Sequence, residues 1–338
     1  MAYIKRKLFP LNVSFFMKNK LILLLKFILS GVLLSYLLSI IPLNGIINAI
    51  FSANLFLFLA GLLLVIPISL LSALETEYLT RIQEIDLSAL EILKIHLATN
   101  FYGLFLPGVL SAGAVKWYKF SKFGKKSAAA VVVVFNRFLE ILMLVFIGII
   151  SSIPILYAIG DNNLLLLLSL IFVAMVFFYI LILKKSGLKF VEKIIFIIPL
   201  PVFIKDKVAK FTGAMLQFQN LRLKDHLEII SLLFLYHGLG VLSFFCFTKS
   251  LNIDLNIWQI GWIRSAMSLA ILLPLSFAGL GIREGTLVFI LNQYGIKPDV
   301  SMALSFLFFS RNILTSLLGG IIEFKEFIIS KKAGIKSL

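Results

Sequence analysis

The chain has 338 residues, of which 60% are hydrophobic and only 14% are charged, and its mean hydropathy is +1.05. This composition excludes a soluble globular protein, because water cannot solvate so large a share of apolar side chains. The 32 lysines and arginines outnumber the 16 aspartates and glutamates. In a membrane protein this excess is typical of cytoplasmic loops that face anionic lipid. No DNA-binding helix pattern accompanies it, and we expect no nucleic-acid partner.

Long apolar runs recur along the whole chain and predict an all-α integral membrane protein. A hydrocarbon core of about 30 Å requires about 20 helical residues, and the first run is too long for a cleavable signal peptide. The connections are short, so we expect a single polytopic membrane domain over residues 1–338. The six predicted spanning helices are 21–41, 55–74, 127–150, 164–183, 227–249 and 301–323.

Two further apolar regions, 92–118 and 257–292, do not resemble simple spans. Each contains a proline and several glycines where a helix would continue, in "LPGVLSAG" and in "LPLSFAGLG". Such residues interrupt the hydrogen bonds of a helix. We expect breaks or hinges at these positions: Pro107, Gly108, Gly113, Pro274, Gly279, Gly281 and Gly285.

The distribution of lysine and arginine predicts the orientation of the chain. Positive charge gathers at both termini, at 113–126 and at 184–226, whereas 42–54 carries no charge and 151–163 carries only Asp161. We therefore expect a multi-pass protein of the plasma membrane with its N- and C-termini in the cytoplasm. The linker 184–226 mixes apolar and basic residues and is expected to lie on the inner surface as an amphipathic segment.

With these segments placed inside and outside, each broken region must enter and leave the membrane on the same face. We therefore expect both to be re-entrant hairpins, which enter from opposite faces. Each is followed by a helix with Phe-x-Arg near its middle, which defines two repeat-like units, 92–150 and 257–323. Paired broken helices in opposite orientation indicate an inverted repeat and point to a secondary transporter whose site lies near the bilayer midplane. We expect the breaks to line a cavity.

Charged residues fall where the predicted spans are deepest. Arg137 and Glu140 are three residues apart on one helical face, and Arg311 lies near the centre of the last span. Arg283 and Glu284 follow the second break directly. Each such residue costs about 3 kcal/mol when it faces lipid, so we expect all of them to face the interior. Arg264 also falls in an apolar region and is a further candidate.

Two interpretations of these charges remain open. Arg137 with Glu140 and Arg283 with Glu284 can be structural ion pairs that hold helices together. With Arg311 the set has three arginines but only two carboxylates, and the unpaired guanidinium calls for an anion. Arginine binds phosphate in bidentate geometry, and lipid phosphate is the anion most available at that depth.

The stretch "LPLSFAGLGIREG" resembles a Pro-Ile-Ser…Gly-x-Gly-x-Arg-Glu signature. It is typical of the flippase-like family that contains the membrane region of lysylphosphatidylglycerol synthases. The sequence departs from the family pattern at 111–113 and at Asn136, where acids are common. The other residues that fit the resemblance are Asn100, Leu106-Pro107-Gly108, Lys116, Arg137 and Gly319-Gly320.

The resemblance implies movement of an anionic or aminoacylated phospholipid, or of a lipid-linked, polyprenyl phosphate-type intermediate, between leaflets. We expect no synthase activity from these residues, because the soluble aminoacyl-transfer domain of the bifunctional members has no counterpart in the 338 residues. Lipids with phosphate head groups are the expected partners, together with a separately encoded synthase or glycosyltransferase. Asn100 and Lys116 join the substrate-binding candidates.

Two alternatives to a transporter are a membrane enzyme of lipid or lipid-linked sugar synthesis and a non-catalytic partner of a separate synthase. In the enzyme, Glu284 would be the general base. The only cluster of acids, from Glu75 to Glu91, follows no metal motif and is interpreted as a solvated helix face. The single cysteine and three scattered histidines also lack metal-ligand spacing. We expect no metal, no cofactor and no catalytic residue.

Overall fold

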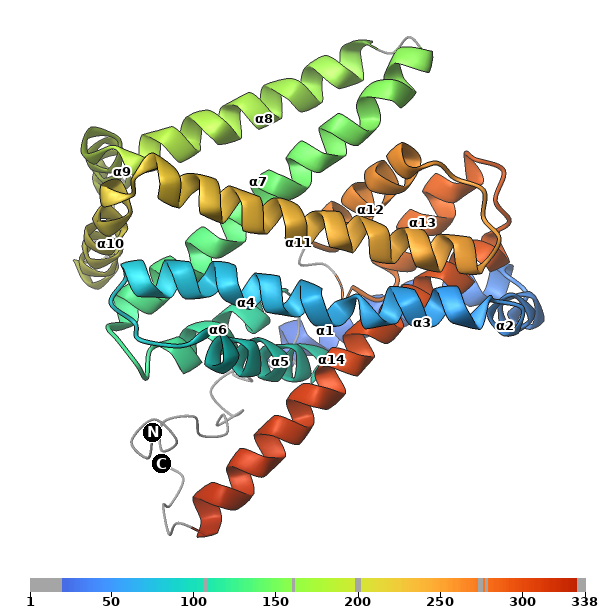
Figure 1. The fold of residues 1–338 in the computed structure, drawn as a ribbon, viewed down its shortest axis with the longest axis horizontal. Helices are drawn as coiled ribbons and strands as arrows, with labels where there is room; N and C mark the ends of the chain where they lie inside the picture. The colour runs from blue at the N-terminus through green and yellow to red at the C-terminus, as the bar shows by residue number, and fades with distance from the viewer. Residues whose placement is uncertain are drawn as a thin grey trace.

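The computed structural model describes residues 20–105, 109–159, 162–197, 202–272, 276 and 279–332. Pro107, Gly108 and Pro274 lie outside the described residues. Within them every regular element is a helix (Figure 1). The helices are α1 (Lys20–Ile40), α2 (Leu43–Phe51), α3 (Leu55–Leu63), α4 (Val65–Ile82), α5 (Ala89–Phe105), α6 (Val109–Phe120), α7 (Lys126–Ile159), α8 (Asn162–Leu183), α9 (Lys185–Ile197), α10 (Val202–Met215), the 3-10 helix η3 (Leu216–Asn220), α11 (Leu223–Ser250), α12 (Ile257–Leu272), α13 (Ile282–Asn292) and α14 (Pro298–Lys332).

The predicted all-α membrane fold is confirmed. Among the described residues five helical stretches are long and apolar enough to cross a membrane, and α1 with α2 supplies a sixth if that bent pair is one span. The pair bends by 87°, and Pro42 stands at the bend because it cannot continue the ladder of helical hydrogen bonds. The five stretches are Leu55–Ile82, Lys126–Tyr157, Leu166–Leu183, Leu223–Ser250 and Pro298–Ile329.

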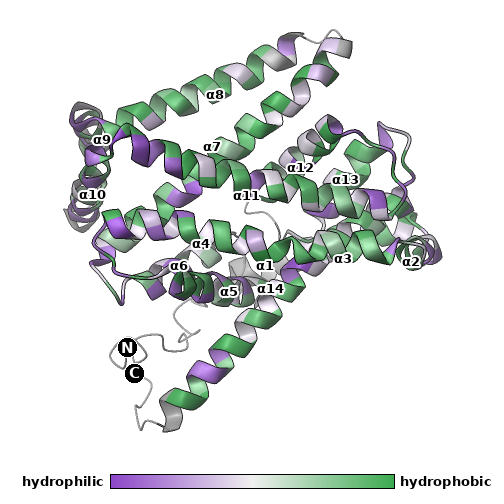
Figure 2. Cartoon of the chain, in the orientation of Figure 1, coloured by the Kyte–Doolittle hydropathy of each residue, from purple (hydrophilic) through white to green (hydrophobic). Residues whose placement is uncertain are grey.

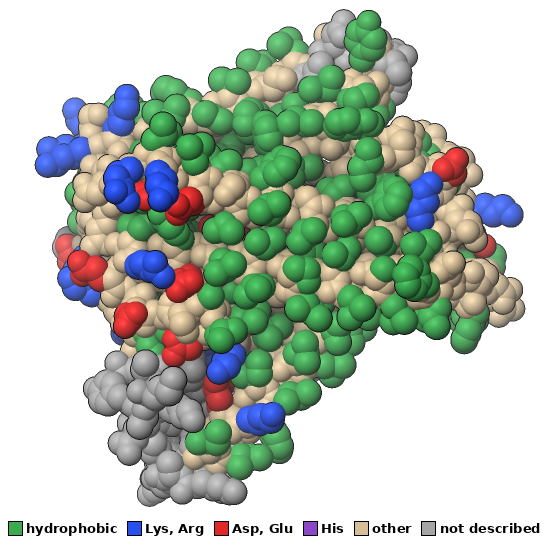
Figure 3. Space-filling model, viewed as in Figure 1, with side chains coloured by type: hydrophobic (Ala, Val, Ile, Leu, Met, Phe, Trp, Pro, Cys, Tyr) green, Lys and Arg blue, Asp and Glu red, His purple; other side chains and the backbone are tan. Residues whose placement is uncertain are grey.

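The surface has a broad apolar band between more polar ends. Figure 3 shows hydrophobic side chains across the middle of the visible face, with lysines, arginines and acids gathered near α9 and α10. Along α8 and α3 the residues are mostly hydrophobic, whereas hydrophilic segments lie at the start of α11 beside α9 (Figure 2). Many large apolar side chains are exposed, among them Phe51, Phe56 and Phe177. This is the surface of a multi-pass membrane protein.

The two broken regions form the helix pairs α5/α6 and α12/α13. Each pair returns the chain to the side from which it came. A Cβ on Gly124, after α6, would lie 2.8 Å from the side chain of Ile85, before α5. Likewise Leu255, before α12, belongs to the same apolar cluster as Ile296, after α13. In Figure 1 these connections lie at opposite ends of the molecule, one near α10 and the other near α2.

Each helix pair packs against the long helix that follows the other pair. Helix α5 packs against α14, and α12 packs against α7. Small residues permit both contacts: a Cβ on Gly319 would lie 1.9 Å from the carbonyl oxygen of Leu97, and a Cβ on Gly148 would lie 3.2 Å from the Cβ of Ser265. Gly148 and Gly319 stand 22 and 21 residues after the first residues of their helices. The packing of the two pairs is thus reciprocal, and the inverted repeat itself stays a prediction.

Positive φ angles mark the second break. Gly279 and Gly281 have φ of 77° and 83°, which residues other than glycine rarely adopt, and α13 begins at the next residue. By contrast, Gly113 and Gly285 lie inside α6 and α13, so the prediction of breaks at these two glycines is wrong. A single glycine costs a helix only about 1 kcal/mol relative to alanine and does not stop it.

The linker between α8 and α11 consists of α9, α10 and η3. It is anchored in the core at Phe218, which is fully buried and stacks on Phe135 of α7 with a ring-centroid distance of 4.3 Å. Met215 is buried beside it. The linker therefore packs against the bundle as well as carrying the exposed lysines expected of an interfacial segment.

Candidate functional site

Polar and charged side chains from six helices gather in the middle of the bundle. Tyr236 and His237 stand at the midpoint of α11, and Arg264 lies halfway along α12. Electrostatic interactions connect these groups with others from α4, α6, α7 and α14. We call this set the central polar cluster; its members are Glu75, Lys116, Asn136, Arg137, Glu140, Tyr236, His237, Arg264 and Arg311.

One side of the central polar cluster is a hydrogen-bonded chain across three helices. Asn136 Nδ2 donates to Glu75 Oε2 at 2.6 Å, and Lys116 Nζ donates to Asn136 Oδ1 at 3.2 Å. An amide carries both a donor and an acceptor, so Asn136 can join a cation to a carboxylate. The resemblance leads us to expect an acid at 136; here Glu75 of α4 supplies the carboxylate instead.

Glu75 corrects one interpretation of the sequence. It was expected on a solvated helix face, but it is only 2% exposed. The reason is that α4 packs against α7 and α11, so this side of the helix faces the bundle. Among the described residues Glu75 Oε1 has no hydrogen-bond donor.

Arg137 and Glu140 form the ion pair that their spacing allows. Arg137 Nη1 lies 2.8 Å from Glu140 Oε2, and the two side chains are 42% and 15% exposed. The partial exposure of Arg137 leaves it accessible from outside the bundle. This arginine is therefore a weaker candidate for a buried anion site than its depth along α7 suggests.

Arg264 and Arg311 are different, because neither faces a carboxylate among the described residues. Arg264 is 6% exposed, and Gly240 of α11 makes room for it, since a Cβ there would lie 2.2 Å from Nη2. Arg311 lies over the ring of Phe308 at 5.0 Å. In both guanidinium groups Nε and Nη1 are buried without a hydrogen-bond partner in the described part of the chain.

The charges of the central polar cluster do not balance. Lys116, Arg137, Arg264 and Arg311 are four cations, and Glu75 and Glu140 are two carboxylates. Arg264 and Arg311 interact with each other and with Tyr236, so two like charges lie close together in a poorly solvated place. A buried charge without a partner costs several kcal/mol. This arrangement is suited to holding an anion.

Arg283 and Glu284 form a closed pair elsewhere. They are 1% and 0% exposed, and they are joined by an ion pair between Arg283 Nη2 and Glu284 Oε1. Arg283 Nε donates to Ser305 Oγ at 2.8 Å, and Glu284 Oε2 accepts from the backbone N–H of Gly281 at 2.7 Å. The pair caps α13 and ties it to α14. This geometry favours the structural ion pair over substrate contact.

The structure does not bring Arg283 to Arg311. Arg283 contacts Ser305 and the ring of Phe309, whose centroid lies 4.3 Å from its guanidinium carbon. Arg311 follows Phe309 by two residues, which is a rotation of about 200° around α14. Arg283 therefore contacts one side of α14, and Arg311 points from another. Of the arginines expected in the interior, the one that lies beside Arg311 is Arg264.

The other candidates are more peripheral. The side chain of Asn100 is exposed, although its carbonyl oxygen accepts from Ser316 Oγ at 3.0 Å and so links α5 to α14.

Sequence reasoning missed a buried ion pair between Lys119 of α6 and Glu323 of α14, to which Tyr102 donates at 2.7 Å. Their positions near the ends of predicted spans indicated solvent-facing charges. In the part of the chain that is described, no group of three or more potential metal ligands is present.

Comparison with known protein families gives one match. The family model described as "Lysylphosphatidylglycerol synthase TM region" matches residues 23–320, which contain every member of the central polar cluster. Neither the curated proteins nor the solved structures gave a match to the chain.

Proposed function

Since the chain belongs to the family of the lysylphosphatidylglycerol synthase TM region, we propose that it moves a lipid with a phosphate-bearing head group between membrane leaflets. The candidate lipids are an anionic or aminoacylated phospholipid and a polyprenyl phosphate-type intermediate. The proposed setting is the plasma membrane, with both termini in the cytoplasm. A separately encoded synthase or glycosyltransferase would supply the lipid or use it.

The observation that carries this proposal is the pair Arg264, which is buried, and Arg311, which is half-buried. In both, Nε and Nη1 are buried and have no hydrogen-bond partner among the described residues. A phosphodiester carries one negative charge and oxygens that accept two parallel hydrogen bonds from a guanidinium. Bound between the two arginines, it would relieve their mutual repulsion and use donors that otherwise lack partners. Lys116 and Arg137 would extend the positive surface toward α6 and α7.

The two arginines stand on different packing units, which suits alternating access. Arg311 belongs to α14, which is held to the α5/α6 pair by the contact of Gly319 with Leu97 and by the Lys119–Glu323 ion pair. Arg264 belongs to α12, which packs on α7, whereas α13 is tied to α14 through the contact of Arg283 with Ser305 and so stays with α14 in the proposed cycle. We propose that α5/α6 and α12/α13 are re-entrant hairpins, and that rocking of one unit against the other exposes the phosphate to each leaflet in turn.

An enzyme with Glu284 as general base is less well supported. Glu284 is fully buried, and both of its carboxylate oxygens already accept hydrogen bonds. A substrate would have to break the cap of α13 to reach it. A non-catalytic partner of a separate synthase would need no unpaired arginines in the interior, and it becomes an outcome of the test below.

The test is lipid translocation in liposomes that contain the purified full chain. Fluorescent phosphatidylglycerol, phosphatidylcholine and a short polyprenyl phosphate would be scored for accessibility to a membrane-impermeant quencher over time. We expect accelerated movement of at least one anionic lipid, lost in Arg264→Gln/Arg311→Gln. Arg81→Gln is the matched control, because the Arg81 side chain is 74% exposed. Wild type that moves no lipid, or a double variant as active as wild type, would overturn the proposal.

A further inference from the structure

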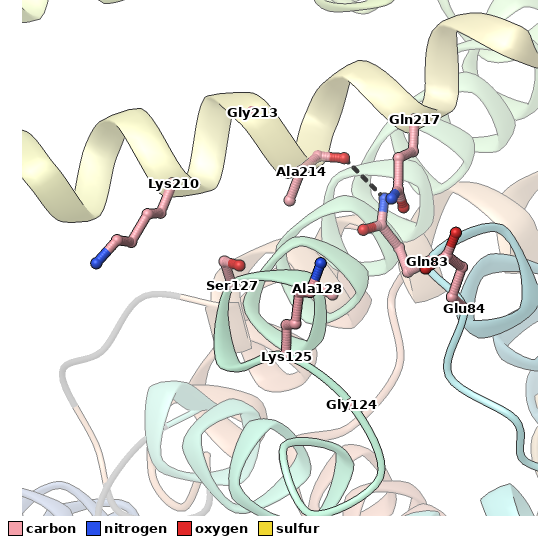
Figure 4. Close-up of a pocket in the computed structure, with 10 residues that line it drawn as sticks. All are labelled: Gln83, Glu84, Gly124, Lys125, Ser127, Ala128, Lys210, Gly213, Ala214 and Gln217. Atoms are coloured by element: carbon pink, nitrogen blue, oxygen red, sulfur yellow. Dashed lines mark hydrogen bonds between the residues drawn. The ribbon is translucent and has the colours of Figure 1, made fainter.

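A cavity of about 450 Å³ lies away from the central polar cluster, at the end of the molecule where α10, the start of α7 and the α4–α5 connection meet (Figure 4). Its volume is within the range of small-molecule sites, about 300–1,000 Å³. Ser127 precedes Asn136 on α7 by nine residues, so the cavity is about 13 Å from the cluster along the helix. The lining residues are Gln83, Glu84, Gly124, Lys125, Ser127, Ala128, Lys210, Gly213, Ala214 and Gln217.

Gln83 presents an unused acceptor to this cavity. Its side chain is only 3% exposed, and Nε2 donates to the carbonyl oxygen of Ala214 at 2.9 Å. Because a carbonyl can only accept, this bond fixes the amide with its oxygen on the other side, which faces Ala128 and Lys125 in Figure 4. Within the described residues neither Gln83 Oε1 nor the buried Oε1 of Gln217 has a donor. A buried acceptor without a donor costs about 1–3 kcal/mol.

The opposite wall of the cavity is cationic. Lys125 and Lys210 are exposed, and no ion pair among the described residues involves either of them. Helix α7 begins at Lys126, so the first N–H groups of the helix, next to Ser127 and Ala128, have no partner within it. Backbone donors and the helix dipole at this end favour an anion.

We propose that the cavity binds a phosphate-bearing head group whose far end carries hydrogen-bond donors. The phosphate contacts Lys125, Lys210 and the start of α7. Hydroxyl or ammonium groups at the far end donate to Gln83 Oε1 and Gln217 Oε1. Glycerol and ethanolamine head groups meet both requirements, whereas choline has the phosphate but no donor. Binding at the cavity does not depend on the proposed function. Only the role of the cavity does, which is to receive the head group before it reaches Arg264 and Arg311.

Binding to the purified full chain in detergent tests this site. Dioctanoyl phosphatidylglycerol, phosphatidylethanolamine and phosphatidylcholine would be titrated by calorimetry, with soluble glycerol phosphate in a parallel arm. We expect the first two lipids to bind at least about tenfold more tightly than phosphatidylcholine, the loss that follows from one unsatisfied buried acceptor. Gln217→Met should reduce that preference, and Lys125→Gln should weaken all three lipids. Gln83→Met is the second variant, and its apparent Tm is measured alongside because it also loses the bond to Ala214.

Lys126→Gln is the matched control. It removes the same charge from the neighbouring residue, which does not line the cavity. Equal weakening by Lys125→Gln and Lys126→Gln would mean that the lipids sense only surface charge, and equal affinity for all three lipids would overturn the role of the glutamines. Competition by glycerol phosphate at the same concentration would assign the site to a soluble polyol phosphate, and its failure to compete would assign it to a lipid.

The two proposals can fail separately. The wild-type chain could move no lipid in liposomes while Arg264→Gln/Arg311→Gln keeps the head-group preference. That result would reject transport and leave the cavity assigned. Transport that is unaffected by Lys125→Gln and Gln217→Met, together with equal affinity for the three lipids, would reject the cavity and leave transport intact.

Discussion

Arg264 of α12 and Arg311 of α14 interact with each other in the bundle interior, and among the described residues neither guanidinium has an acceptor for its buried Nε and Nη1. Residues that serve only stability are not expected in this arrangement, because an uncompensated buried charge opposes folding. The arginines are therefore expected to reduce stability unless an anion is bound. In the proposed function, an anion would make the same groups a stabilising contact.

Replacing either arginine with methionine should separate stability from function. We expect Arg264→Met and Arg311→Met each to raise the apparent Tm of the protein in detergent, because an apolar side chain of similar length removes the unpaired charge. Lipid movement in liposomes should fall at least about tenfold in each variant, since a charge-assisted hydrogen bond contributes about 1.5–3 kcal/mol. Thermal unfolding followed by tryptophan fluorescence measures the first effect. A lower Tm in both variants would identify them as structural residues.

The Arg283–Glu284 pair should respond in the opposite way. Glu284→Gln leaves Arg283 buried and unpaired, and we expect a loss of about 3–5 kcal/mol in the free energy of unfolding. Glu140→Gln is the comparison, and its effect should be smaller because the protein encloses Arg137, which is 42% exposed, far less than Arg283, which is 1% exposed. Unfolding by denaturant in mixed micelles would measure both.

The double variant Arg283→Met/Glu284→Met decides whether this pair also binds substrate. It removes both charges together, so we expect it to be more stable than Glu284→Gln and to retain lipid movement. A double variant that folds but moves no lipid would show that the pair contacts the substrate, as the sequence alone suggested.

Sequence reasoning identified features that depend on spacing along one helix. The three-residue separation of Arg137 and Glu140 was sufficient to predict their contact, and the length of the apolar runs was sufficient to predict the spans. Glycines also indicated the second break, where Gly279 and Gly281 have positive φ.

Features that depend on rotation and on distant neighbours were not accessible. The burial of Glu75 depends on Asn136, 61 residues later in the chain. The sequence makes Arg283 a candidate for substrate contact, because nothing local shows that its guanidinium already binds Ser305. Helix geometry gives the rotation that separates Arg311 from Phe309. It does not show which side of α14 faces α13.

The reciprocal packing of the long helices can be tested through their glycines. Gly319→Ala would place a methyl group 1.9 Å from the carbonyl oxygen of Leu97, and the forced separation of α5 and α14 should cost about 1–3 kcal/mol. Gly238→Ala is the matched control in the interior of α11, because its Cβ would meet no atom within 4 Å. We expect it to stabilise the protein by up to about 1 kcal/mol through helix propensity. Equal apparent Tm values for the two variants would contradict the close packing at Gly319.

Cross-links can show which helices move against each other during transport. In a Cys246→Ala background, Gly103→Cys/Ala112→Cys joins α5 to α6 within one unit, where the two Cβ atoms would be 3.9 Å apart, inside the usual disulfide range. Gly113→Cys/Val133→Cys joins α6 to α7 across the two units, at a site where a Cβ on Gly113 would lie 3.6 Å from Val133 Cγ1. Both pairs would be closed with the same short bifunctional methanethiosulfonate reagent, which joins each cysteine through a disulfide that can be reduced.

We expect the cross-link between α5 and α6 to leave lipid movement unchanged, because those helices belong to one rigid unit in the proposed cycle. The cross-link between α6 and α7 should stop movement, and reduction should restore it. Uncross-linked protein with the same cysteines separates the effect of the substitutions from the effect of the tether. Full activity with α6 tethered to α7 would mean that the α5/α6 pair and α7 do not move apart. The phosphate would then have to pass between Arg264 and Arg311 by a motion confined to α12 and α14.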